Sequence, residues 1–250
     1  MTAVFLHGVP ETSAIWDQVR AHLDVDSVAL PLPGFGVPRP AGFTATKDAY
    51  ADWLAGSLES VRGPVDLVGH DWGALLTLRV ATAYDLPLRS WTADLANCFA
   101  PQYRWHPRGQ TWQTPGTGEE AVRTWLDTPA DSPVSIAGAL RGHGSSPRLA
   151  AAMAEQLTAD TMDAILRLYR SAAPNVHRDW GSALSRGTRA PGLVVIPTED
   201  PFNDLTASRR VAEQLHAQVV ELPGLSHAWM AQDPSGAVAV LENFWRGLPA

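Results

Sequence analysis

The chain has 250 residues, of which 45% are hydrophobic and 18% charged. This composition excludes a disordered chain, and the length allows one or two folded domains. The net charge of −7, with Lys47 as the only lysine, argues against a nucleic-acid partner, because phosphate binding requires clustered basic residues. The one cysteine, Cys98, excludes a disulfide framework, and no Cys/His cluster has metal-ligand spacing.

Membrane insertion is not expected, because no apolar run approaches 18 residues. The first strand-like run begins directly, without a positively charged leader, so we expect a cytoplasmic protein. We also expect no metal and no cofactor. The oligomeric state, monomer or homodimer, stays open.

Short apolar runs alternate with amphipathic ones along the chain, which predicts a doubly wound, mostly parallel sheet of about six strands. The runs typical of buried parallel strands are 3–7, 27–30, 65–69, 90–94, 192–196 and 218–222. The helix-like stretches between and after them are 14–23, 47–61, 74–83, 205–217 and 236–246.

This alternation stops between residues 98 and 186, where Pro/Gly turns separate helical stretches such as 118–126 and 161–173. A structureless loop of that length is implausible in a compact domain. We therefore predict an α/β core formed by residues 1–97 and 187–250, with residues 98–186 inserted as a helical lid.

The most informative segment is Gly69-His70-Asp71-Trp72-Gly73, which follows a buried strand and opens a helix. Such a strand-to-helix turn strains its middle residue and exposes that side chain above the sheet. Asp71 stands where many hydrolases have serine, and a carboxylate is ionised at neutral pH without a general base. A carboxylate nucleophile suits displacement at saturated carbon, giving an alkyl ester that an activated water then hydrolyses.

At this segment the chain resembles the α/β-hydrolase superfamily, and within it the epoxide hydrolases and haloalkane dehalogenases. The run His7-Gly8-Val9-Pro10 is similar to the oxyanion loop of that group. The resemblance implies an oxyanion hole formed by the backbone N–H groups of Val9 and Trp72. The bond before Pro10 is a candidate cis peptide, and we expect His7 to orient the loop.

The order nucleophile, acid, histidine also matches these hydrolases. His227, in a turn after the last predicted strand, would activate water, and a carboxylate would orient its ring. Glu199, Asp200 and Asp204 compete for that role, and Asp200 best matches the family pattern. Some dehalogenases instead place the acid after the preceding strand, where this chain has Asp94 and Asn97.

The leaving group separates the two activities, because an epoxide oxygen needs a proton donor and a halide does not. Tyr169 resembles the ring-opening tyrosine of the epoxide hydrolases. Their second lid tyrosine has no match here, and Arg108 or Gln110 falls near its place. We find no partner for the insertion histidines His106, His143 and His177.

The preferred hypothesis is an epoxide hydrolase whose substrate is a bulky, apolar small molecule. The expected substrate contacts are Trp72, Tyr103, Trp105 and Trp112, and the further insertion tryptophans Trp125 and Trp180 suit the same kind of substrate.

Two alternatives remain. Trp72 is also similar to a halide-binding tryptophan of the haloalkane dehalogenases, although Val9 stands where their second donor is often Asn. Leu75 and Leu76 argue against a carboxylate substrate. The other alternative is a cyclase, a lyase or a non-catalytic ligand-binding protein on the same scaffold.

Overall fold

The computed structural model describes residues 1–248 and contains one six-stranded sheet whose paired neighbours are all parallel. The strands follow the order β2-β1-β3-β4-β5-β6 across the sheet. Their bounds are β1 Thr2–Leu6, β2 Asp26–Leu30, β3 Val65–Gly69, β4 Leu88–Ala93, β5 Gly192–Pro197 and β6 Gln218–Leu222. The predicted α/β fold class and the six predicted strands are confirmed.

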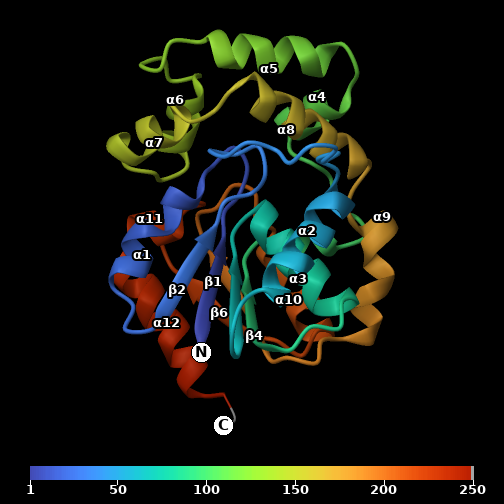
Figure 1. Ribbon diagram of the computed structural model, residues 1–250, viewed down its shortest axis with the longest axis vertical. Coiled ribbons are helices and arrows are strands. Elements are labelled where there is room, and N and C mark those ends of the chain that lie inside the picture. The colour runs from blue at the N-terminus through green and yellow to red at the C-terminus, as the bar shows by residue number, and fades with distance from the viewer. Residues whose placement is uncertain (249–250) are drawn as a thin grey trace.

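Helices cover both faces of the sheet (Figure 1). Helices α1 and α12 pack together on one face, while α2, α3 and α10 lie on the other. The bounds are η1 Ser13–Trp16, α1 Asp17–Ala21, α2 Lys47–Glu59, α3 Trp72–Ala83, η2 Ala96–Phe99, α10 Leu205–Gln214, α11 Trp229–Gln232 and α12 Pro234–Arg246. Because both faces are covered, β1, β3 and β5 are buried almost throughout, as their apolar sequences require.

Local chemistry explains two of the differences from the predicted helices. The stretch 14–23 splits into η1 and α1, and the buried Trp16 indole at this junction donates to the Leu6 carbonyl oxygen at 3.0 Å, which holds the turn against the sheet. Helix α10 ends at Gln214 instead of 217, since His216 adopts a φ of 53° that no α-helix continues. Helix α2 ends at Glu59 instead of 61.

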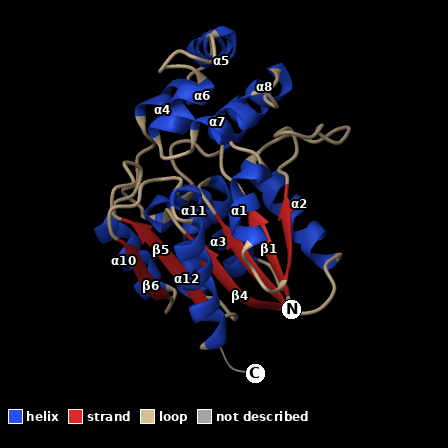
Figure 2. Ribbon diagram, turned by 90° about the vertical axis from the view of Figure 1, so that its left-hand side faces the viewer, coloured by secondary structure: helices blue, strands red, loops and turns tan. Residues whose placement is uncertain are grey.

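Five helices between β4 and β5 lie beyond the carboxyl ends of the strands, and we refer to them as the helical layer (Figures 1 and 2). They are α4 Pro107–Gln113, α5 Thr117–Asp127, α6 Ile136–Gly142, α7 Pro147–Ala154 and α8 Ala159–Ser171. Helix α9, His177–Trp180, and η3, Gly181–Arg186, then lead back to β5. Among the described residues, no helix is long and apolar enough to cross a membrane.

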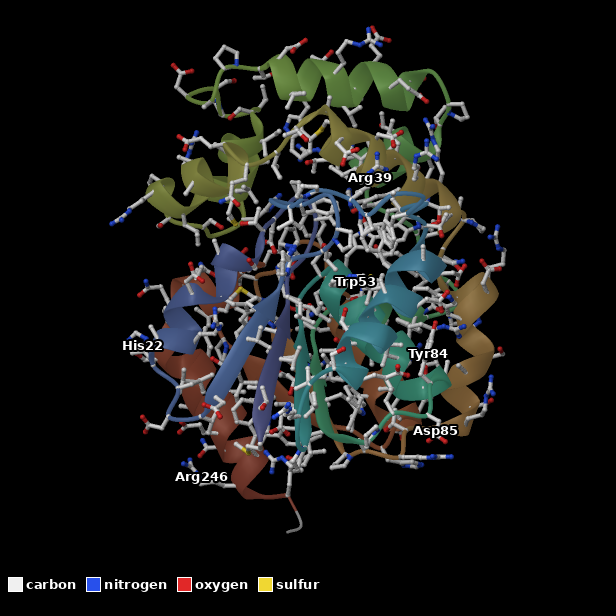
Figure 3. All side chains as sticks on the ribbon, viewed as in Figure 1. His22, Arg39, Trp53, Tyr84, Asp85 and Arg246 are labelled. Carbon is white, nitrogen blue, oxygen red and sulfur yellow. The ribbon has the colours of Figure 1, made fainter. Side chains whose placement is uncertain are left out.

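Side chains from both parts lie between the helical layer and the sheet (Figure 3). Arg39, in the loop after β2, forms ion pairs with Asp160 and Asp163 of α8, the second at 2.9 Å. The hydroxyl of Thr161 donates to the Gly34 carbonyl oxygen at 2.7 Å. These polar contacts fix α8 above the ends of the strands.

Strand register brings distant segments together at this edge. Leu6 of β1 pairs with Gly69 of β3, and Pro197 of β5 pairs with Leu222 of β6. Because parallel strands end at the same edge, the four loops that follow these strands all emerge beneath the helical layer.

Candidate active site

Asp71 occupies a sharp turn between β3 and α3. Its φ of 51° and ψ of −120° are strained for a residue with a side chain. A Cβ on Gly69 would lie 2.3 Å from the Gly73 carbonyl oxygen, and one on Gly73 would lie 2.6 Å from the Leu6 carbonyl oxygen. Glycine is therefore required at both positions. The Asp71 N–H donates to Asp94 Oδ1 at 2.8 Å, which braces the turn.

The loop after β1 holds one oxygen of this carboxylate. The Val9 N–H donates to Asp71 Oδ1 at 2.8 Å, and the Val9–Pro10 peptide bond is cis, as the sequence suggested. His7 Nδ1–H donates to the Gly8 carbonyl oxygen at 2.8 Å, while its Nε2 accepts from the Leu32 N–H at 3.0 Å, so His7 orients the loop. Trp72 is the first residue of α3, where backbone N–H groups have no partner within the helix.

His227 lies on the other side of Asp71. Its Nδ1–H donates to Asp200 Oδ2 at 2.9 Å, and its Nε2 lies 4.0 Å from Asp71 Oδ2. Asp200 is held in place because its Oδ1 accepts from the Phe202 N–H at 2.9 Å. Burial alone would lower the pKa of His227, but the charge of Asp200, its hydrogen bond to the ring and the charge of Asp71 together raise the pKa above its ordinary value.

The other candidate acids lie elsewhere. Glu199 is exposed, and Asp204 caps α10 by accepting from the Ala207 N–H at 2.9 Å. Asn97 donates from Nδ2 to the Phe202 carbonyl oxygen at 3.0 Å. The carboxylate of Asp94 contacts the elbow, and Asp200 is the acid bonded to His227.

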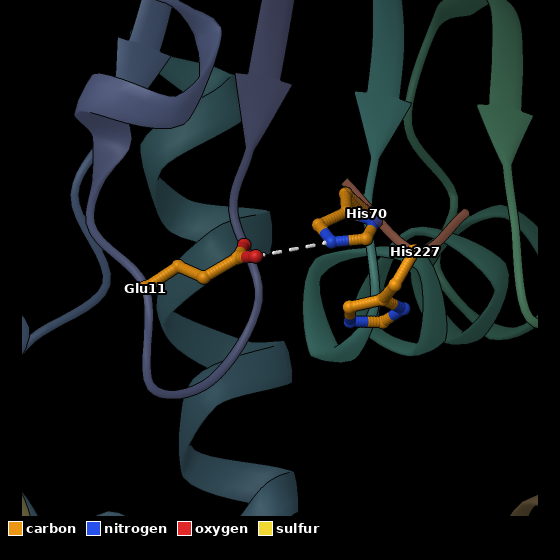
Figure 4. Close-up of side chains that lie close together, drawn as sticks. All are labelled: Glu11, His70 and His227. Carbon is orange, nitrogen blue, oxygen red and sulfur yellow. Dashed lines mark hydrogen bonds and ion pairs between the residues drawn. The ribbon is translucent and has the colours of Figure 1, made fainter. Parts of the chain in front are cut away.

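A buried network that the sequence did not predict connects the loop after β1 with the elbow (Figure 4). His70 donates from Nδ1 to Asp94 Oδ2 at 2.6 Å and from Nε2 to Glu11 Oε1 at 3.3 Å. Glu11 Oε2 accepts from the Gly8 N–H at 3.0 Å. The Trp229 indole N–H also donates to Asp94 Oδ2, at 2.8 Å.

These contacts determine the charges of the network. Burial disfavours a charged His70, but the carboxylates of Asp94 and Glu11 outweigh it and raise the His70 pKa well above its ordinary value. Burial likewise opposes ionisation of Glu11, yet the charge and hydrogen bond of His70, the charge of His227 and the Gly8 N–H together lower the Glu11 pKa to about 2. Ligand atoms of Glu11, His70 and His227 lie within 4.8 Å of one another. Because Asp94 and Glu11 already occupy both His70 nitrogens, this cluster is better suited to hold a proton than a metal ion.

Above Asp71 lies a cavity of about 270 Å³ between the strand ends and the helical layer. Most of its large side chains are aromatic: Trp72, Tyr103, Trp105, Trp112, Tyr169 and Phe202. The Trp72 and Trp105 rings stack with centroids 5.3 Å apart. All four residues predicted to contact the substrate therefore line the cavity, whereas Trp125 and Trp180 do not.

Tyr169 lies close to the elbow. Its ring packs edge-on against Trp72 with a centroid distance of 5.3 Å. Burial, followed by the charge of Asp71, raises the pKa of the Tyr169 phenol well above its ordinary value. Burial also raises the pKa of Asp71 to about 6, although the nearby charge of His227 opposes this shift. The carboxylate is thus still mainly ionised at pH 7.

Of the three insertion histidines, for which the sequence suggested no partner, His106 and His177 have a polar one. His106 Nε2 lies 3.4 Å from Tyr169 Oη, and His177 Nδ1–H donates to the Phe99 carbonyl oxygen at 2.8 Å. His143 lines the cavity with its ring 5.9 Å from that of His227. All of these contacts join residues far apart in the chain, so no local pattern could have indicated them.

Residues 3–241 match the sequence model of the alpha/beta hydrolase family. The chain belongs to this family. No curated protein sequence matches it.

Solved structures share the hydrolase fold at low sequence identity. The chain is similar to a Bacillus megaterium epoxide hydrolase in complex with an inhibitor, with a TM-score of 0.75, 18% identity and coverage of 98% of this chain and 93% of that one. The chain is also similar to a haloalkane dehalogenase loop variant from Bradyrhizobium elkanii, with a TM-score of 0.73, 18% identity and coverage of 98% of this chain and 89% of that one. For a thermophilic esterase from Thermogutta terrifontis, the TM-score is 0.74 and the identity 17%, with coverage of 98% of this chain and 89% of that one. Since these three names describe three activities, the similarity identifies the fold and leaves the reaction to be argued from the site.

Proposed function

We propose that this hydrolase opens epoxides to diols through an ester on Asp71. Oδ1 of Asp71 is engaged by the Val9 N–H, whereas Oδ2 faces His227 without a hydrogen bond between them. Oδ2 is therefore the attacking atom. It forms a bond to an epoxide carbon, the carbon–oxygen bond of the ring breaks, and the Tyr169 phenol gives its proton to the oxygen that leaves.

Hydrolysis of the ester follows. His227 Nε2 takes a proton from water, and the hydroxide adds to the carbonyl carbon of the Asp71 ester. The oxyanion that forms accepts hydrogen bonds from the backbone N–H groups of Val9 and Trp72. Its collapse breaks the bond between the carbonyl carbon and the substrate oxygen, and this oxygen takes the proton of the added hydroxide, which releases the diol and regenerates the carboxylate. Asp200 stabilises the His227 imidazolium, whose proton returns to solvent while Tyr169 is reprotonated.

The observation that carries this proposal is the carboxylate at the elbow with His227 Nε2 4.0 Å from its free oxygen and Asp200 on the opposite ring nitrogen. An ionised carboxylate is a nucleophile by itself, so His227 is available to activate water in the second step. Tyr169, buried in the same cavity, supplies the proton that an alkoxide leaving group needs.

The helical insertion, residues 98–186, acts as a lid over the core formed by residues 1–97 and 187–250. It closes the cavity with aromatic side chains and excludes bulk water from the ester. A cavity of about 270 Å³ lined in this way suits a small-molecule epoxide with a bulky, apolar substituent. The protein needs no cofactor for this reaction.

Turnover of an epoxide panel that includes styrene oxide tests the proposal. We expect diol formation by the wild type, none by Asp71→Asn, and a loss on the order of 10²-fold or more in Tyr169→Phe, which lacks the proton donor. If no epoxide in the panel yields a diol, the proposal is wrong.

One observation favours haloalkane dehalogenation as the second candidate. The Trp72 indole Nε1 is buried beside the cavity and has no hydrogen-bond partner among the described residues, so it could bind a halide. Halide release that persists in Tyr169→Phe and is lost in Trp72→Phe would favour this function. Epoxide opening should show the opposite dependence on the two residues.

A further inference from the structure

We propose that His106 is a positioning residue for Tyr169, donating its Nε2–H to the phenol oxygen so that the phenol proton remains free for the substrate. This inference rests on the proposed epoxide chemistry and adds a specific partner to it. The two side chains come from different parts of the helical layer: His106 precedes α4, and Tyr169 lies in α8.

The backbone fixes which nitrogen of His106 carries the proton. The Gly109 N–H donates to His106 Nδ1 at 3.1 Å, so Nδ1 must present a lone pair. A neutral imidazole then has its one proton on Nε2, and this atom lies 3.4 Å from Tyr169 Oη. The phenol oxygen is thus the acceptor in this pair, and its own O–H is available to a second partner.

The surroundings keep this arrangement neutral and fixed. Burial, followed by the charge of Arg108, lowers the pKa of His106 to about 4, so the ring is uncharged in the physiological range. The ring packs against Phe202 and Trp112, with centroid distances of 5.1 Å and 6.1 Å. It can therefore neither rotate freely nor gain a second proton near pH 7.

The hydrogen bond addresses a difficulty in the first chemical step. A buried Tyr169 near the negative charge of Asp71 is a poor acid, because its phenolate is unfavourable there. A donor on the phenol oxygen stabilises the phenolate that remains after the proton has moved to the alkoxide. His106 keeps its own proton throughout. Only Tyr169 matches one of the two lid tyrosines of the epoxide hydrolases, and His106 places a second polar side chain beside it.

The kinetic test compares His106→Leu with His106→Gln in rapid-mixing experiments with an epoxide that the wild type turns over. We expect His106→Leu to slow alkylation of Asp71 on the order of 10-fold while hydrolysis of the ester keeps its rate. His106→Gln retains an N–H donor and should recover part of the loss. The control is His22→Gln, an exposed histidine outside the cavity. Equal alkylation rates in wild type and His106→Leu, or equal slowing of both steps, would overturn the inference.

A spectroscopic test does not depend on turnover. In ¹⁵N NMR of the full chain, His106 should show a protonated Nε2 and an unprotonated Nδ1 from pH 6 to 8. Tyr169→Phe should shift the Nε2–H signal and leave Nδ1 nearly unchanged. A proton on Nδ1, or a signal insensitive to Tyr169→Phe, contradicts the hydrogen bond. If this bond is present but no epoxide alkylates the wild type, the proposed function fails while the side-chain pair stands.

Discussion

His227 Nε2 and Asp71 Oδ2 lie 4.0 Å apart, too far for a direct hydrogen bond and close enough for their charges to interact. The carboxylate oxygen is therefore free to act as the proposed nucleophile, because it does not share a proton with His227. Once an ester has formed, the same imidazole nitrogen lies beside the carbonyl group that water must reach. This separation is consistent with the two successive steps that we propose for Asp71 and His227.

The two steps should differ in their dependence on pH. Asp71 must be ionised to attack, and burial raises its pKa to about 6, with His227 opposing the shift. Alkylation should thus fall about tenfold for each pH unit below about 6. Hydrolysis requires a neutral His227, whose pKa is raised by Asp200 against the effect of burial. The hydrolysis rate should therefore begin to fall at a higher pH than the alkylation rate does. Rapid-quench kinetics separates the steps, and a fall of both rates at the same pH would be inconsistent with this division of roles.

Replacing Asp200 should affect hydrolysis alone. In Asp200→Asn the carboxylate that orients His227 Nδ1 is lost, so we expect ester hydrolysis to fall by about 10³–10⁴-fold with alkylation nearly unchanged. The matched control is Glu199→Gln, since Glu199 adjoins Asp200 but is exposed. Stopped-flow fluorescence can follow the two phases. An Asp200→Asn variant that hydrolyses its ester at the normal rate would exclude Asp200 as the partner of His227.

The buried Glu11–His70 contact predicts a pH-dependent stability. Glu11→Gln leaves the charge of His70 partly uncompensated and should lower the free energy of unfolding by about 3 kcal/mol at pH 7. Because the pKa of Glu11 is lowered to about 2 in the folded state, its stabilisation is present above its unfolded pKa and is lost as pH falls toward 2.

The difference between variant and wild type should accordingly shrink below about pH 4. Urea unfolding at several pH values measures it, with the exposed Glu155→Gln as the control, expected to change stability by less than about 0.5 kcal/mol. A difference that is constant between pH 7 and pH 3 would argue against an ion pair.

Gly8 offers a steric test of the contact between the loop and the elbow. A Cβ at this position would lie 2.4 Å from Asp71 Cβ, so Gly8→Ala must displace Asp71. A shift of about 1 Å is enough to reduce turnover on the order of 10²-fold. Gly56→Ala is the control, because Gly56 is exposed on α2 and a Cβ added there would meet no atom within 4 Å. Alanine at this position should stabilise the helix by up to about 1 kcal/mol. Normal turnover by Gly8→Ala would contradict the described geometry.

Local patterns in the sequence were sufficient to predict much of the fold. Each strand is a short apolar run, and the strand, turn and helix around Asp71 are contiguous in the chain, so their residues indicate the geometry directly. Strand order was not predictable in this way, because it depends on pairing between residues far apart. Helix ends were missed where a single backbone angle decided them, as at His216.

The residues at the strand ends were the most directly predictable part of the site, and the lid aromatics were predicted through the resemblance to known hydrolases. Asp71 and His227 come from turns that follow strands, and the structure brings Asp200 against His227. The contacts of His70 with Glu11 and of His106 with Tyr169 join positions about 60 residues apart. They arise from the packing of β1 beside β3 and of α4 beside α8, which no single segment encodes.

Mass spectrometry can detect the proposed ester on Asp71. In His227→Gln the water is no longer activated, so incubation with an epoxide that the wild type converts to a diol should add the mass of one substrate molecule to the protein. The peptide that contains Asp71 should carry this mass, and the double variant Asp71→Asn/His227→Gln should remain unmodified. If His227→Gln gains no mass from such a substrate, Asp71 is not the nucleophile.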